Sequence, residues 1–319
     1  MGIAALFIII CHAPANGVKL PPVLNTIFIH CDVGVDIFLL LSGFGLYYSL
    51  QKWKKHFLER GHILMWYKVR LMRLFVPYLI FIVPLISWKS INNGFLWGEI
   101  LLDLTTFSFW FNGRGLWFIS MLVPVYFISP FVYELVKKGR GDILLILCIF
   151  VSFSAGCIID MFVAECFYKQ LLFCLMRYPS FVLGMCCANG VLNDNSFAKK
   201  YLLIIVLSIL VFLCIKVILN VDISLLAVYW AISGGIVVLL TFLLEYTSPL
   251  LKRFFRFMGK ISLESYCTNV YIAGSVMILF SSFSESVSYL ISVIFCILMS
   301  CIIHILSEFV YVKYYNYRR

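Results

Sequence analysis

Residues 287–310 read VSYLISVIFCILMSCIIHILSEFV and decide the fold class. This stretch contains one acidic residue, Glu308, and neither lysine nor arginine. A helix needs about 20 mostly apolar residues to cross the roughly 30 Å hydrocarbon core of a bilayer. Because hydrocarbon offers no partners for backbone amides, a continuous apolar run of this length predicts a membrane-spanning helix.

The composition of the whole chain extends this interpretation. Of the 319 residues, 63% are hydrophobic and 13% are charged. A soluble domain could not cover so much apolar surface, so lipid has to be the solvent. Long continuous apolar runs also favour helices over the alternating pattern of a membrane β-barrel. We therefore predict an all-α, polytopic transmembrane helix bundle of about ten spans.

The predicted spans use nearly the whole chain, which predicts one membrane domain over residues 1–319. The aromatic segment 95–111 contains Glu99 and Asp103, so we interpret it as an interfacial or re-entrant helix. The spans are residues 2–13, 33–50, 74–91, 116–136, 143–163, 175–192, 201–220, 225–246, 261–280 and 287–310.

The basic residues set the predicted orientation. Lysine and arginine concentrate in the cytoplasmic connections of membrane proteins. Here 19 of the 25 basic residues lie in alternate connections, at residues 51–73, 137–140, 199–200, 252–260 and 313–319. This pattern predicts that both termini are cytoplasmic. The formal net charge of +10 is spread between apolar runs, which indicates membrane lipids and argues against nucleic acid as a partner.

The cysteines indicate neither a metal site nor a disulfide framework. The chain has twelve of them, and they are scattered without a C-x-x-C pair.

Ionisable groups inside predicted spans are candidate functional residues, because hydrocarbon disfavours charge. They are His12, Asp36, Arg177, Glu245 and His304. We favour His12, at the end of the first apolar run, for proton transfer. A neutral imidazole there could accept the proton of an alcohol that attacks a thioester.

A structural interpretation of His12 is at least as consistent with the composition alone. In that alternative, the ring lies at the level of the lipid headgroups and has no catalytic role. We interpret His30 and His304 as structural, with His304 hydrogen-bonded to a neighbouring helix.

A basic cluster precedes the third predicted span. Arg70 and Arg73 are three residues apart on one helical face, and Lys68 lies beside them. Two guanidiniums could hold the phosphates of a nucleotide-bearing donor such as coenzyme A. Cytoplasmic anchoring to acidic lipid headgroups calls for the same residues, and the sequence leaves both interpretations open.

Several separated motifs resemble one known family when they are taken together. Residues 34–38 read GVDIF and are followed by LSGF at 41–44, while residues 259–263 read GKISL with Tyr266 close behind. Further blocks lie at residues 2–12, 70–78, 116–130 and 177–184. Their order and spacing resemble the acyltransferase 3 family of integral membrane O-acyltransferases.

The resemblance implies an activity and a location. It implies transfer of an acyl group, most often acetyl, from cytoplasmic acetyl-CoA or another acyl-CoA to a hydroxyl of a cell-surface or exported carbohydrate. The acyl-CoA would be a donor substrate, with no bound cofactor and no metal. The expected location is the bacterial inner membrane.

The resemblance also suggests roles for individual residues. We assign His12 as general base and the three basic residues Lys68, Arg70 and Arg73 as donor-binding groups. In the predicted topology, a channel for the pantetheine arm would have to join these two places. Supporting roles are suggested for Asp36, Ser42, Trp117, Arg177 and Tyr266.

The chain departs from the family pattern at two positions. The arginine that precedes the family histidine by eleven residues would fall at Met1, and the first predicted span is short. Either the sequence starts late or this copy lacks the arginine, and the short first span favours a truncated first helix. Asn269 stands where many relatives carry a histidine, so this position cannot supply a second base.

Two other functions remain open on the sequence. Ten apolar helices with aromatic residues also suit a transporter or flippase for a glycan or lipid-linked sugar. The departures from the family pattern suit an inactive relative that scaffolds polysaccharide assembly. A requirement for acetyl-CoA separates the enzyme from the transporter, and acetyl-CoA binding without turnover would favour the scaffold.

Overall fold

The computed structural model describes residues 1–54, 61–94, 96–162, 165–193, 197–218 and 223–316. These residues form helices and contain no strand, so the predicted all-α fold is confirmed. Of the basic residues assigned to the cytoplasmic side, Lys55, Arg60, Arg318 and Arg319 lie outside the described residues.

The chain divides into two compact units. Unit 1 comprises Met1–Gly34, Val69–Ser108 and Ser248–Arg319, and unit 2 comprises Val35–Lys68 and Phe109–Thr247. The expectation of one domain over residues 1–319 stays a prediction.

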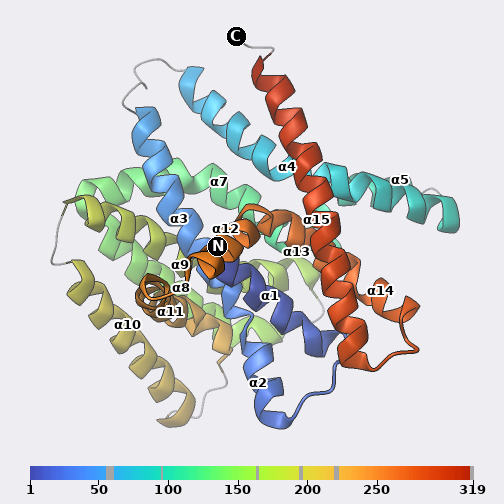
Figure 1. Cartoon of the computed structure of the whole chain (residues 1–319). Helices are drawn as coiled ribbons and strands as arrows, with labels where there is room; N and C mark the ends of the chain where they lie inside the picture. Colours follow the sequence, from blue (N-terminus) through green and yellow to red (C-terminus); the bar gives the residue numbers. More distant parts are fainter. Residues whose placement is uncertain (55–60, 95, 163–164, 194–196, 219–222, 317–319) are drawn as a thin grey trace. The chain divides into compact units, whose positions relative to one another are not determined.

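In unit 1, the first helix is held by helices from the C-terminal part of the chain. Helix α1 packs against α2, α12 and α13, and α15 runs beside α13 and α14 (Figure 1). The complete helices of this unit are α1 (Gly2–Ala15), α2 (Pro22–His30), α5 (Trp97–Leu104), α12 (Pro249–Lys260), α13 (Ser262–Tyr271), α14 (Ala273–Leu279) and α15 (Glu285–Asn316).

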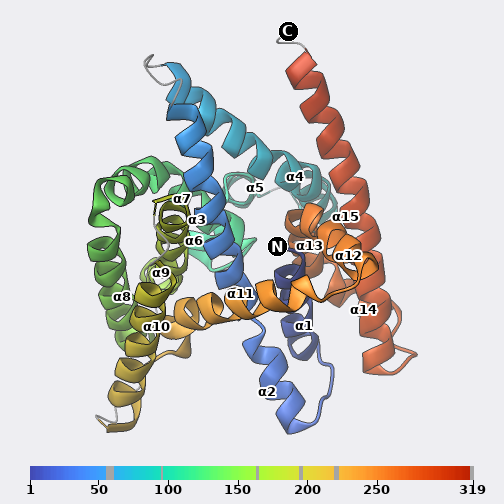
Figure 2. The same cartoon turned by 60° about the vertical axis from the view of Figure 1, so that its left-hand side comes forward.

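In unit 2, α9 is the central helix and packs against α7, α8 and α11 (Figure 2). The α-helices of this unit are α3 (Val33–Lys54), α6 (Phe107–Asn112), α7 (Trp117–Leu135), α8 (Gly141–Ile158), α9 (Cys166–Asn193), α10 (Phe197–Leu213) and α11 (Tyr229–Glu245). Its shorter turns are η1 (Val136–Arg140), η2 (Ile159–Phe162), η3 (Cys214–Ile218) and η4 (Leu225–Val228). Helices α3 and α6 each begin with two residues of unit 1, and α4 (Gly61–Asn93) contributes to both units.

Within the described residues, seven helical stretches are long and apolar enough to cross a membrane. They are Pro22–Trp53, Ile63–Ile91, Trp117–Met161, Cys166–Leu192, Tyr201–Ile218, Leu225–Glu245 and Glu285–Tyr314. The stretch Trp117–Met161 covers two predicted spans, and Gly139, with φ 77°, turns the chain between them. The count of ten spans and the cytoplasmic termini stay predictions.

Two predicted segments take a different form from a single spanning helix. Residues 261–280 form α13 and α14, which are separated at Ile272. The described part of the aromatic segment, residues 96–111, forms α5 and most of α6, and the 8 residues of α5 rise only about 12 Å. Neither α5 nor α6 can cross a bilayer, as expected of an interfacial or re-entrant segment.

Helices α3 and α9 approach each other until their backbones touch. A Cβ added at Gly43 would lie 2.1 Å from the carbonyl oxygen of Phe181, and one added at Gly184 would lie 1.9 Å from that of Leu40. Only glycine fits at both positions, as in the small-residue contacts of membrane helices. This contact sets the distance across which side chains of α3 and α9 meet.

Candidate functional site

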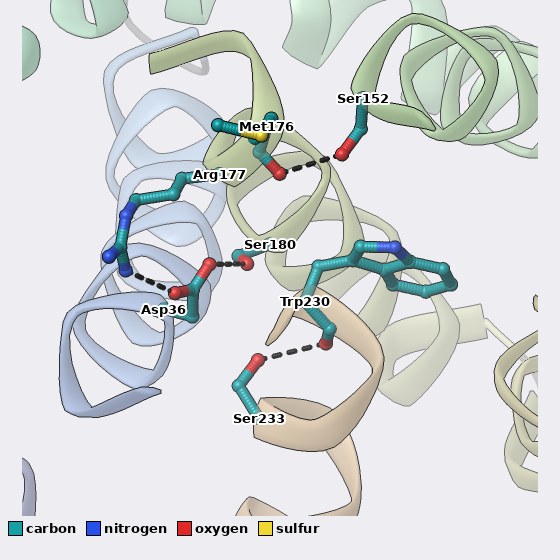
Figure 3. Close-up of polar contacts among 7 residues, drawn as sticks. All are labelled: Asp36, Ser152, Met176, Arg177, Ser180, Trp230 and Ser233. Atoms are coloured by element: carbon teal, nitrogen blue, oxygen red, sulfur yellow. Dashed lines mark hydrogen bonds and ion pairs between the residues drawn. The ribbon is translucent and has the colours of Figure 1, made fainter. Parts of the chain in front are cut away.

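A buried ion pair joins α3 to α9 in unit 2. Nη1 of Arg177 donates to Oδ2 of Asp36 across 2.6 Å, and both side chains are 0% exposed. The Ser180 hydroxyl donates to the other carboxylate oxygen, Oδ1, also across 2.6 Å. Figure 3 shows Arg177 and Ser180 reaching Asp36 from the same helix. Asp36 lies in the first turn of α3, where the helix dipole also favours a negative charge.

Aromatic rings surround the Arg177 guanidinium. Its central carbon lies 5.2 Å from the ring centre of Trp117, 5.0 Å from that of Phe173 and 5.8 Å from that of Tyr229. Such contacts stabilise a desolvated cation. The structure therefore brings together three of the predicted supporting residues, Asp36, Trp117 and Arg177.

Hydroxyl groups also tie the helices around this pair. The Ser152 hydroxyl of α8 donates to the carbonyl of Met176 at 2.8 Å and to that of Ala227 at 3.1 Å. The Ser233 hydroxyl donates to the carbonyl of Trp230 within α11 (Figure 3). Together with the buried ion pair, these contacts indicate a rigid polar core in unit 2.

In unit 1, His12 meets a residue from the far end of the sequence. His12 is half-buried near the end of α1, and its Nδ1 lies 2.7 Å from Nδ2 of Asn269 on α13. Asn269 is 2% exposed, and no donor among the described residues reaches its buried Oδ1. The Tyr289 hydroxyl of α15 donates to the carbonyl of Ile9 and holds α1 from a second side.

A cavity of about 480 Å³ also lies in unit 1. The cations Arg73 and Lys260 line it together with Glu264, His304 and Glu308. The His304 Nδ1 is 2.9 Å from Oε1 of Glu264, which is 4% exposed. The predicted hydrogen bond from His304 to a neighbouring helix is therefore confirmed.

Helix α13 connects this cavity to His12. Glu264 lines the cavity and Asn269 contacts His12, and the two are five residues apart on one helix. Five residues of helix rise about 7.5 Å. The two side chains are also about 140° apart around the helix, so the charged cavity and the paired imidazole lie on different faces of α13.

The three predicted donor-binding residues all lie on α4, and their surroundings differ. Arg73 lines the cavity, Arg70 is half-buried on the same helix, and Lys68 is exposed in unit 2. Of the other predicted supporting residues, Tyr266 is buried in α13 and Ser42 is half-buried in α3.

Sequence reasoning missed Ser180, Glu264 and Lys260 as site residues. Glu264 gave a usable signal, because it is an ionisable residue inside the predicted span 261–280. Ser180 gave none, since buried serines occur throughout apolar helices. Asn269 was noted only as an absent base, and the structure shows it as the partner of His12.

The fold defines the class of protein first. Its long apolar helices are those of a multi-pass integral membrane protein. The chain belongs to the acyltransferase 3 family, whose sequence profile, described as an acyltransferase domain, matches residues 2–306. The predicted family is thereby confirmed over nearly the whole chain. No curated protein and no solved structure gives a significant match.

Fold and family together establish the general activity. The protein is a membrane acyltransferase, which takes an acyl group from a donor and passes it to an acceptor within lipid surroundings.

Proposed function

We propose that this protein is an O-acetyltransferase of the bacterial inner membrane, which transfers acetyl from acetyl-CoA to a hydroxyl of a cell-surface or exported carbohydrate. The observation that carries the proposal is the contact of His12 with Asn269, on the helix that also lines the charged cavity. An imidazole oriented by a hydrogen-bond partner is the arrangement that general-base catalysis requires.

His12 acts as the base through its outer ring nitrogen, Nε2. The acceptor hydroxyl gives its proton to Nε2 while its oxygen attacks the thioester carbonyl. The carbon–sulfur bond then breaks, and the thiolate of coenzyme A takes the proton from the imidazolium. The products are an O-acetyl ester and free coenzyme A.

The orientation of the Asn269 amide sets which ring nitrogen of the neutral His12 carries the proton, and therefore whether Nε2 has a free lone pair. When Nδ2 of Asn269 donates to Nδ1, the neutral ring carries its proton on Nε2 and cannot accept another there. When the amide is turned by 180°, Oδ1 accepts from Nδ1–H and Nε2 becomes the base. The second orientation also gives Oδ1 a donor, and it moves Nδ2 to the buried place that Oδ1 leaves.

The donor phosphates would bind at the mouth of the cavity. Arg73 and Lys260 supply two cations to the cavity wall beside the carboxyl groups of Glu264 and Glu308, and guanidinium and ammonium groups both suit phosphate. The pantetheine arm would then follow α13 from Glu264 towards Asn269 and bring the thioester to His12.

The test is acetyl transfer by the purified full chain, reconstituted in vesicles with acetyl-CoA and a surface-glycan acceptor. Substituting His12→Ala should lower kcat by a factor of about 10² to 10⁴, as for other general bases. His30→Ala is the matched control, because His30 is an exposed histidine of the same unit. Full activity of the His12 variant, or equal losses in both variants, would refute the assignment.

A further inference from the structure

Apart from Lys260, which lines the cavity, helix α12 lies outside the proposed chemistry, and it has an unusual surface. Its sequence is PLLKRFFRFMGK, with four basic and no acidic residues. The helix begins at Pro249, capped by the Ser248 hydroxyl, which accepts from the amide of Leu251. Its 12 residues rise only about 18 Å, which is too short to cross a bilayer.

One face of α12 is fixed against α1. Met258 is 0% exposed and packs in a cluster with Ile9 and Ile261. A Cβ added at Gly2 would lie 1.9 Å from the carbonyl oxygen of Phe255, so the two helices touch through their backbones. This contact fixes the rotation of α12 about its own axis.

The rest of the helix divides into two sectors. At 3.6 residues per turn, the four cations fall within an arc of about 100°. The apolar residues Leu250, Phe254 and Phe257 fall within the next arc of about 60° and are 78%, 41% and 42% exposed. The cationic and the exposed apolar sectors therefore lie side by side, both directed away from the α1 contact.

We propose that α12 lies in the plane of the membrane interface and binds anionic lipid headgroups. Its cations other than Lys260, which lines the cavity, meet the lipid phosphates, while Leu250, Phe254 and Phe257 enter the adjoining acyl-chain region. Interfacial helices combine a cationic face with an apolar one in this way. A soluble polyanion would satisfy the cations but would leave the apolar sector in water.

This proposal is independent of the acetyl-transfer chemistry. It has a structural consequence, because the face of α12 opposite the lipid holds α1, which carries His12. Anionic lipid bound to α12 would therefore stabilise the position of α1.

The experiment places a photoreactive residue in the apolar sector. The full chain carries p-benzoylphenylalanine in place of Phe257 and is reconstituted in vesicles of phosphatidylglycerol and phosphatidylcholine in equal amounts. After illumination, mass spectrometry counts the adducts of each lipid. The same residue in place of Phe150, an exposed position of the apolar helix α8, reports the background ratio.

We expect lipid adducts at position 257 with a clear preference for phosphatidylglycerol, and no preference at position 150. Adding Arg253→Gln and Arg256→Gln should reduce the preference strongly, because each charge near an anionic surface contributes about a fivefold factor. Adding Arg253→Lys and Arg256→Lys should retain it, which separates loss of charge from loss of structure.

The proposal is overturned by any of three results. The first is an absence of lipid adducts at position 257. The second is a lipid ratio there equal to the ratio at position 150. The third is a preference that is unchanged by removal of both arginine charges.

Discussion

Arg177 and Asp36 form a fully buried ion pair, with Nη1 of the arginine 2.6 Å from Oδ2 of the aspartate. Removing one partner would leave the other charge buried and unpaired, and that carries a large desolvation cost. Arg177→Met should therefore destabilise the protein by about 3–5 kcal/mol, because it strands the carboxylate. The double variant with Asp36→Leu should lose less, since it removes both charges.

Thermal unfolding in detergent measures this difference. The matched control is the exposed pair of Lys19 and Glu285, which are 2.8 Å apart with side chains 88% and 43% exposed. Lys19→Gln should leave Tm nearly unchanged, because water screens such pairs. A double variant less stable than either single one would contradict the interpretation of Asp36–Arg177 as a coupled pair.

The contact of α3 with α9 predicts which glycines tolerate a methyl group. Gly43→Ala places Cβ against the Phe181 carbonyl, so the helices must separate and the ion pair above must stretch. We expect a loss of about 1–3 kcal/mol or more. Gly45→Ala, two residues along the same helix, meets nothing within 4 Å and should be neutral or slightly stabilising.

Unfolding of the two alanine variants in the same detergent provides the comparison. Equal melting temperatures for the Gly43 and Gly45 variants would show that α3 and α9 do not pack through their backbones.

The sequence predicted the helices well because their signal is local. Apolar runs and basic connections are properties of neighbouring residues, and they located the long helices without tertiary information. The break at Ile272 escaped prediction because it falls at an apolar residue inside a continuous run, and Gly274, two residues later, lies within α14. The early start of α4 at Gly61 escaped because its first turns are mixed in polarity.

The candidate site was predicted as a set of residue types rather than as contacts. The family resemblance selected Asp36, Arg177 and Trp117, but the partner of Asp36 lies 141 residues away in the chain. His12 and Asn269 are 257 residues apart. No helical period encodes such pairs, because they depend on how distant helices pack.

The pairing of His12 with Asn269 predicts a pH-dependent signature. Asn269→Leu removes the group that orients the ring, so acetyl transfer should fall about 10- to 100-fold, comparable to the loss of other residues that orient a histidine. Asn269→Asp keeps an oxygen acceptor for Nδ1–H and should retain activity. Its negative charge favours the protonated imidazole, so the acid side of the pH–rate profile should move to higher pH by about one unit.

Rates measured between pH 5 and 9 distinguish this role from a merely structural one. A structural asparagine would lower activity in both variants without moving the profile. An unchanged rate in the leucine variant would show that Asn269 does not orient the base.

The cavity beside α13 predicts a defect specific to the nucleotide part of the donor. Arg73→Gln and Lys260→Gln each remove a cation from the cavity wall, so the KM for acetyl-CoA should rise roughly tenfold or more while kcat changes little. The control is Lys313→Gln, which removes an exposed cation near the end of α15 and should leave KM unchanged.

A second donor substrate separates binding of the phosphates from other effects. Acetyl-pantetheine lacks the nucleotide and its phosphates, so it should react equally well with the wild type and both cavity variants. If the cavity variants impair acetyl-pantetheine as much as acetyl-CoA, then Arg73 and Lys260 act on something other than the donor phosphates.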